Sequence, residues 1–231
     1  MTLQLVIGNK NYSSWSMRPW VLMAQLGIAF DERKLRLDFG TPASTFHREV
    51  AALSPAGRVP VLLDGGFAVW DSLAIVEYLH ERFPDLGVWP ADGRARARAR
   101  SLCAEMHAGF AALRTHCPMN IEAHLPEVGQ RIWREQEAVR RDLTRIEAMW
   151  AEALAASGGP FLFGAFSAVD AYYAPVCMRL RGYALPVSES TRAYVDQVAA
   201  ASGVARWIAD ALQEHDWIAE DEPYRQRPAT P

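Results

Sequence analysis

The chain has 231 residues, of which 50% are apolar and 22% are charged, and its formal net charge is −3. This composition is typical of a globular protein and excludes a disordered or fibrous chain. No basic excess points to a nucleic-acid partner. The apolar runs fall well short of the ~18 residues that a membrane-spanning helix needs, so we expect no membrane partner either.

The cysteines predict a reducing compartment. Cys103, Cys117 and Cys177 are too few, and odd in number, for a disulfide framework. The N-terminus also lacks the charged start of a signal peptide, so we expect a cytoplasmic protein. Two pairs, Cys103 with His107 and His116 with Cys117, have metal-binding side chains, but no geometry unites them, and we expect no metal site.

The first third of the chain alternates between strand and helix patterns. An apolar run predicts a strand over 3–7, and apolar residues at helical spacing predict a helix over 16–26 that Ser14 or Ser16 caps. The strict alternation of apolar and polar residues over 34–39 predicts a second strand.

A hairpin and a further helix follow a polar stretch that we interpret as a loop with a short helix. The apolar runs 59–64 and 67–70 flank two glycines, which is typical of a β-hairpin. Asp71 and Ser72 then precede a helical pattern that ends near Pro84.

The rest of the chain shows only helical spacing. The change of period predicts two domains, residues 1–83 and 94–231, joined by a linker over 84–93 that is rich in Pro, Gly and Asp. The helical segments are expected over 102–113, 132–150, 167–180, 191–201 and 204–212.

Three short motifs lie where chemistry is expected. A cluster of hydroxyl side chains between Tyr12 and Ser16 lies at a helix start, where backbone N–H groups and the helix dipole favour an anion. Pro60, after Val59, opens a strand with a peptide bond that is either trans or cis. The third motif, Asp71-Ser72, opens a helix. Helix capping alone is the competing interpretation of the first and third motifs.

Together, the motifs and the element order βαβ-α-ββα resemble the thioredoxin-like N-terminal domain of the cytosolic glutathione transferases. The all-helical remainder resembles the second domain of that family. Ser167-Ala168-Val169-Asp170 matches the buried capping box of its core helix. Within the family, Ser13-Ser14-Trp15-Ser16-Met17-Arg18 resembles the Ser-Ser-Cys-Ser-x-Arg motif of the zeta class.

The resemblance implies a set of glutathione-binding residues. Ser13 would donate a hydrogen bond to the glutathione sulfur and favour the reactive thiolate. The Val59 backbone would pair with the cysteinyl backbone of glutathione, next to a cis Pro60. Ser72 would bind the γ-glutamyl carboxylate at a helix N-terminus, and Asp71 would face its ammonium group.

Two positions depart from the family pattern. Trp15 stands where the zeta class has a cysteine that is associated with its isomerase activity. Asp71 stands where Glu or Gln is commoner. Tyr12, Ser14 and Ser16 remain alternatives to Ser13 as the thiolate donor.

The family resemblance also implies a homodimer with a second-substrate pocket against the helical domain. Trp15, Met106, His107 and Phe110 are the candidates for its lining, although Met106 and Phe110 also fit an ordinary core. The leading hypothesis is a glutathione transferase that acts on a small apolar electrophile. The alternatives are a glutathione-dependent cis–trans isomerase of the maleylacetoacetate isomerase type and a non-catalytic binding module.

Overall fold

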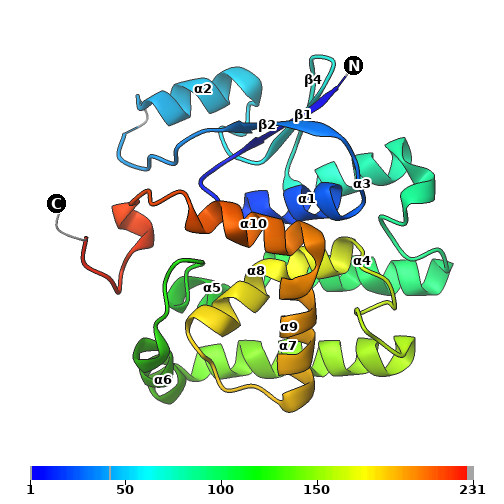
Figure 1. Ribbon diagram of the computed structural model, residues 1–231, viewed down its shortest axis with the longest axis vertical. Helices are drawn as coiled ribbons and strands as arrows, with labels where there is room; N and C mark the ends of the chain where they lie inside the picture. Colours follow the sequence, from blue (N-terminus) through cyan, green and yellow to red (C-terminus); the bar gives the residue numbers. More distant parts are fainter. Residues whose placement is uncertain (1, 42, 228–231) are drawn as a thin grey trace.

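The computed structural model describes residues 2–41 and 43–227, and its N-terminal part is a four-stranded sheet with helices on it (Figure 1). The strand order is β2-β1-β3-β4, with β1 parallel to β2 and the other neighbours antiparallel. The expected order βαβ-α-ββα is therefore confirmed. The elements are β1 (Leu3–Ile7), α1 (Ser14–Gln25), β2 (Phe30–Lys34), α2 (Thr45–Leu53), β3 (Val61–Asp64), β4 (Phe67–Trp70) and α3 (Ser72–Arg82).

All other helices lie in the C-terminal part, as expected. The chain reaches them through a short 3₁₀ turn, η1, and a second such turn, η2, lies near the C-terminus. The expected domain ranges include Met1 and residues 228–231, which lie outside the described residues. The elements are η1 (Pro84–Leu86), α4 (Gly93–Ala108), α5 (Ala111–His116), α6 (Pro126–Glu135), α7 (Glu137–Ser157), α8 (Ala168–Gly182), α9 (Glu189–Ala200), α10 (Ser202–Leu212) and η2 (Ala219–Asp221).

The predicted strand over 34–39 is wrong in position, because β2 ends at Lys34. Its partner β1 ends at Ile7, so the ladder has no further residues to pair with. Leu35 and Leu37 alternate with polar residues for another reason: both are buried in a second apolar cluster on the other side of the sheet from the main core.

Helix α1 begins two residues before the predicted start. Its N-cap position is Ser13, not Ser14 or Ser16. The Ser16 hydroxyl instead accepts a hydrogen bond from the backbone N–H of Gly8, 3.1 Å away. This bond fixes the turn that follows β1 against the first turn of the helix.

Two of the predicted helices are interrupted. The segment 102–113 breaks at Gly109, where an added Cβ would lie 2.7 Å from the carbonyl oxygen of Glu105, and at Phe110, whose φ is 55°. The segment 132–150 breaks at Gln136, between α6 and α7. Apolar spacing continues across both breaks because both sides pack on the same core, so the pattern conceals them.

Helix α1 lies between the sheet and the helical part and contacts α8 and α10 (Figure 1). Its Trp20 ring packs edge-on against Trp207 of α10, with 5.2 Å between the ring centroids. The Lys10 ammonium lies 4.4 Å from the Trp20 ring centroid, and the Trp207 indole N–H donates to the Lys10 carbonyl at 3.0 Å. Gly203 allows the close approach, because an added Cβ would lie 2.7 Å from the carbonyl oxygen of Val21.

The predicted capping box of α8 is confirmed. The Asp170 carboxylate accepts hydrogen bonds from the backbone N–H groups of Ser167 and Leu162, at 3.0 and 3.1 Å, and from the Tyr194 hydroxyl at 2.9 Å. Ser167 and Tyr194 lie at or in helices of the core, and Leu162 lies in the segment before α8. Asp170 itself is fully buried. No helix in the described parts of the chain has the length and apolar character to cross a membrane.

We expect Asp170→Ala to lower the free energy of unfolding by ~3 kcal/mol or more, because three buried donors lose their acceptor. The matched control is Asp92→Ala, which removes the exposed N-cap of α4 and its bonds to Arg94 and Ala95. That change should cost ~1 kcal/mol. Urea unfolding at neutral pH measures both variants, and equal losses would contradict the role given to Asp170.

The same carboxylate gives a pH dependence. Burial raises the pKa of Asp170 to about 6, against about 3.9 in an unfolded chain. The folded state therefore binds this proton more tightly than the unfolded chain does. The stabilisation that protonated Asp170 gives the folded state is complete below about pH 4 and is lost as the pH rises through 6. Unfolding of wild type and Asp170→Asn over this range should show the wild type losing stability relative to the variant as the pH rises. A difference that stays constant would contradict the raised pKa.

Candidate functional site

A cavity of about 570 Å³ lies between the N-terminal part and the helical part. The sheet side contributes the start of α1, the chain after β2, helix α2 and the segment before β3. The helical side contributes α5, α8 and η2. The lining residues are Tyr12, Ser13, Ser14, Trp15, Leu37, Phe39, Phe46, His47, Gly57, Arg58, Val59, Ala111, Arg114, Thr115, Pro118, Met119, Arg179 and Asp221.

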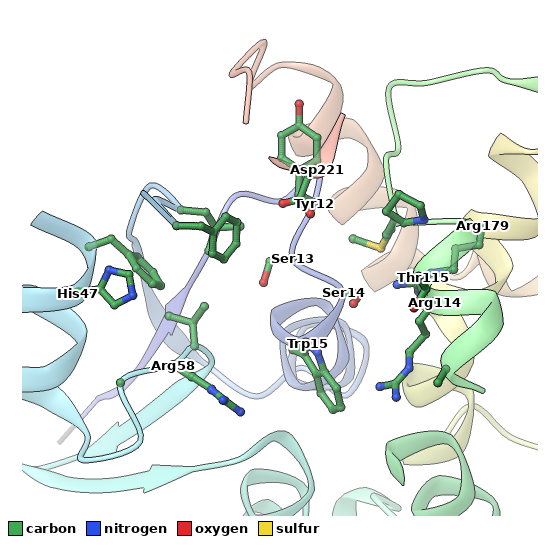
Figure 2. A pocket seen from close by; sticks show the side chains of 18 residues that line it. Tyr12, Ser13, Ser14, Trp15, His47, Arg58, Arg114, Thr115, Arg179 and Asp221 are labelled. Carbon is green, nitrogen blue, oxygen red and sulfur yellow. The ribbon is translucent and has the colours of Figure 1, made fainter. Parts of the chain in front are cut away.

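Ser13 and Ser14 both line the cavity at the N-terminus of α1 (Figure 2). The Ser13 hydroxyl donates to the Ser16 hydroxyl at 2.7 Å. Since a hydroxyl both donates and accepts, Ser16 is able to donate back if the Ser13 proton turns to a ligand. The Ser14 hydroxyl has no hydrogen bond to another described residue. The N-terminus of a helix of this length favours a negative charge beside both serines.

Tyr12 lines the cavity but directs its hydroxyl away from it. The hydroxyl donates to the Glu222 carboxylate at 2.7 Å, and the Asp216 carbonyl lies 3.1 Å from the same oxygen. Burial, with the neighbouring Glu222, raises the pKa of Tyr12. Figure 2 shows the tyrosine hydroxyl pointing outward from Ser13. Tyr12 therefore holds the C-terminal segment in place and is poorly oriented to meet a thiol.

The Val59–Pro60 peptide bond is cis, as the resemblance implied. Val59 lines the cavity just before β3, and its backbone N–H and C=O make no hydrogen bond to another described residue. One free donor and one free acceptor on the same residue are what a peptide backbone needs to pair in an extended conformation.

Asp71 and Ser72 lie at the N-terminus of α3, outside the lining of this cavity. Asp71 is the N-cap, with a φ of 69°, and accepts from the Leu73 N–H at 2.9 Å. Its other carboxylate oxygen lies 3.4 Å from Nε2 of His107. The Ser72 hydroxyl is buried and shares a hydrogen bond of 3.0 Å with the Tyr172 hydroxyl. These contacts show helix capping at Asp71 and packing at Ser72, and glutathione binding by the two residues stays a prediction.

The helical side of the cavity differs from the expected one. Of the four expected pocket residues, Trp15 lines it, whereas Met106 and Phe110 are buried in the main core. His107 packs edge-on against Trp15, with 5.0 Å between ring centroids, and does not reach the wall. The break at Gly109 and Phe110 is the reason, because it turns the chain so that α5 replaces the end of α4 at the cavity.

Polar and charged side chains of the wall are the residues that the sequence pattern missed. His47 and Arg58 lie to one side of Ser13, and Arg114 and Arg179 to the other (Figure 2). The wall also contains Asp221, whose pKa is raised to about 6 by burial and by the charges of its acidic neighbours. The expectation of an apolar pocket is therefore incomplete.

The C-terminal segment that carries Asp221 is attached to the sheet domain by ion pairs. Lys34 pairs with Glu214 at 3.1 Å, and Arg36 with Asp216 at 3.0 Å. The signal in the sequence was charge complementarity between the acidic segment over 214–222 and basic residues at the end of β2 and just after it. Groups of three or more metal-binding side chains that could hold an ion are not found among the described residues.

Two family models match most of the chain. The glutathione S-transferase N-terminal domain matches residues 12–82, and the glutathione S-transferase C-terminal domain matches residues 94–210.

Individual relatives match at low to moderate identity. A dichloromethane dehalogenase from Methylorubrum extorquens is 34% identical over 67 residues, 29% of this chain and 23% of the relative. Maleylacetoacetate isomerase from Pseudomonas aeruginosa is 46% identical over 61 residues, 25% of this chain and 29% of the relative. The chain thus matches less than a third of the length of either relative.

The fold has close counterparts among solved structures. A glutathione transferase homolog from Burkholderia (strain BGR1), crystallised with bound glutathione, superposes with a TM-score of 0.69 at 24% identity. The match covers 91% of this chain and 98% of that one. With a thioredoxin-like N-terminal domain, a helical C-terminal domain and family models that cover both, the chain belongs to the glutathione S-transferase family.

Proposed function

We propose that the protein is a glutathione transferase that uses the cavity beside Ser13 to join the glutathione sulfur to a small electrophile. The single observation that carries the proposal is the placement of Ser13 and Val59 in one cavity. Ser13 is a hydroxyl donor at a helix N-terminus, and Val59 is a backbone position with both hydrogen-bonding groups free.

The start of α1 would activate the thiol. A thiolate beside Ser13 gains the hydroxyl hydrogen bond and the positive end of the helix dipole, and both lower the pKa of the glutathione thiol. The hydroxyl of Ser16 supports this role, since it compensates Ser13 by donating in turn. The protein's own cysteines are poor nucleophiles compared with the glutathione thiol, because burial raises the pKa of Cys103 and raises that of Cys117 to about 12.

The rest of glutathione would be held by its backbone and its charges. The cysteinyl backbone would pair with Val59, and the γ-glutamyl group would lie toward Asp71 and Ser72 at the start of α3. Arg58 and His47 line the cavity on the same side and suit the glycyl carboxylate.

The reaction would need positioning more than acid–base chemistry. The thiolate attacks the electrophilic carbon, a carbon–sulfur bond forms, and the leaving group departs with its electron pair. The thiol proton passes to solvent when the thiolate forms. Holding both substrates in one cavity supplies the remaining rate enhancement.

We expect Ser13→Ala to reduce kcat/KM for conjugation by about 10- to 100-fold, the worth of one hydrogen bond to a charged group. Glutathione should still bind, and the pKa of its bound thiol should rise, as followed by the ultraviolet absorbance of the thiolate. Ser14→Ala is the matched control, with the same loss of a hydroxyl from the same wall, and should change neither quantity much. If the two variants exchange these results, Ser14 is the thiolate donor.

The isomerase is the second candidate function, favoured by the 46% identity to the Pseudomonas aeruginosa enzyme over 61 residues. Trp15 counts against it, because the zeta-class motif has a cysteine there.

Measuring free thiol and product together during turnover separates the two reactions. We expect one glutathione to disappear for each product formed, because a transferase consumes its thiol. Constant free thiol during turnover of a cis-olefinic acid would establish the isomerase instead.

A non-catalytic binding module remains the third alternative, and turnover by the wild type would exclude it. We also propose a homodimer and a cytoplasmic location. Phe67 and Trp70 of β4, 63% and 41% exposed, support a partner surface on that edge of the sheet. Three free, buried cysteines support a reducing compartment.

A further inference from the structure

Two arginines of the helical part lie in the cavity wall and form no ion pair with another described residue. Asp221 lines the same cavity, and the charge of Arg179 acts on its carboxylate, but the two are not in ion-pair contact. Arg179 of α8 is 5% exposed, and it donates from Nε to the Cys117 carbonyl at 2.9 Å and from Nη1 to the Pro175 carbonyl at 3.2 Å. Arg114 of α5 is half-buried. Within the described chain, neither guanidinium has a carboxylate within 4.0 Å.

A third arginine adds to the positive charge of this region. Arg18 is 1% exposed, and its guanidinium carbon lies 4.0 Å from the Trp15 ring centroid. The guanidinium carbon of Arg114 lies 5.6 Å from the same ring. Nε and Nη1 of Arg18 have no hydrogen-bond partner among the described residues. Burial lowers the pKa of Arg179 to about 10, and the charges of Arg18 and Arg114 act in the same direction.

Desolvating a cation that no carboxylate pairs with is costly, and a ligand that brings a negative charge into this wall would offset that cost. A guanidinium group matches a carboxylate geometrically, with two parallel hydrogen bonds. The carboxylates of glutathione are poor candidates, because the proposed peptide-binding residues Arg58 and His47 lie on the other side of Ser13 from Arg114 and Arg179 (Figure 2).

We infer that the electrophile carries a carboxylate, which Arg114 and Arg179 bind, while its apolar body lies among Trp15, Pro118 and Met119. The inference rests on the proposed function and names the substrate class of the same cavity. It replaces the purely apolar electrophile expected from the sequence. An organic acid with an activated carbon a few atoms from its carboxylate fits the arrangement, since Ser13 faces the same space.

A matched pair of probes tests this inference: para-chloro-meta-nitrobenzoate and its methyl ester. In both, the thiolate attacks the carbon that bears chlorine, the carbon–sulfur bond forms, and chloride leaves with the bonding electrons. The two probes share an aromatic body and differ in charge. Steady-state kinetics at saturating glutathione gives kcat/KM for each.

We expect Arg114→Gln to reduce kcat/KM for the acid by ~10-fold more than for the ester, as the loss of a charge-assisted hydrogen bond implies. Most of the change should lie in KM for the acid. Arg179→Lys, which keeps the charge and loses the fork, should give a smaller change in the same direction. Arg192→Gln removes an exposed charge of α9 and is the matched control, with the acid-to-ester ratio of the wild type.

Several outcomes would overturn the inference. Equal losses for acid and ester in Arg114→Gln would mean that the arginine supports the fold or the reaction generally. A rise in KM for glutathione, with the acid-to-ester ratio retained, would mean that Arg114 binds glutathione. A wild type that turns over the ester but is not saturated by the acid would also contradict it.

A binding measurement separates this inference from the proposed function. Calorimetry with the unreactive meta-nitrobenzoate should show binding to the wild type and at least ~10-fold weaker binding to Arg114→Gln. If glutathione does not bind, and neither the chloronitrobenzoate nor its methyl ester is turned over, the proposed function fails. The arginine site is then decided by meta-nitrobenzoate alone, and a wild type that does not bind it overturns the inference.

Discussion

The packing of α1 against α10 is the constraint on which the rest of the structure depends. Trp20, Lys10 and Trp207 form one buried unit in which an ammonium group lies over indole rings and two carboxylates, Glu32 and Asp210, neutralise it at 2.7 and 2.6 Å. Cation–π and ion-pair contacts are worth most where water is excluded. Because α1 belongs to the sheet domain and α10 to the helical domain, this unit fixes the relative position of the two.

The cavity is a consequence of that fixed position. Its sheet side holds Ser13 and Val59, and its helical side holds Arg114 and Arg179. A shift of one domain against the other would separate the groups that we propose bind glutathione from those that we propose bind the second substrate. The C-terminal segment adds a further connection, because Glu222 accepts one hydrogen bond from Tyr12 across the domain boundary and another from Asn120 of the helical part.

Burial of charge divides the molecule into stabilising and functional regions. Asp170 is buried with its oxygens fully engaged by donors, and it begins a core helix. Lys10 is buried with two carboxylates beside it. Beside the cavity, Arg18 and Arg179 are buried and Arg114 is half-buried, and among the described residues carbonyl groups and aromatic rings surround them while no carboxylate forms an ion pair with them. In a protein of this family, such a difference indicates where a ligand is expected to bind.

The sequence by itself determined the order of elements, the capping pair at the start of α3 and the capping box at Ser167, because local spacing and turn chemistry specify them. The cis bond before Pro60 followed from the family resemblance alone, since the residues themselves left trans and cis open. Only the tertiary structure decided where β2 ends, since its length depends on its partner strand. It also decided that α5 replaces the end of α4 at the cavity. The chain breaks at Phe110, where φ is positive, but the apolar spacing continues across the break, so the sequence pattern gives no sign of it. Arg114 and Arg179 lie 65 positions apart, and packing alone brings them to one wall.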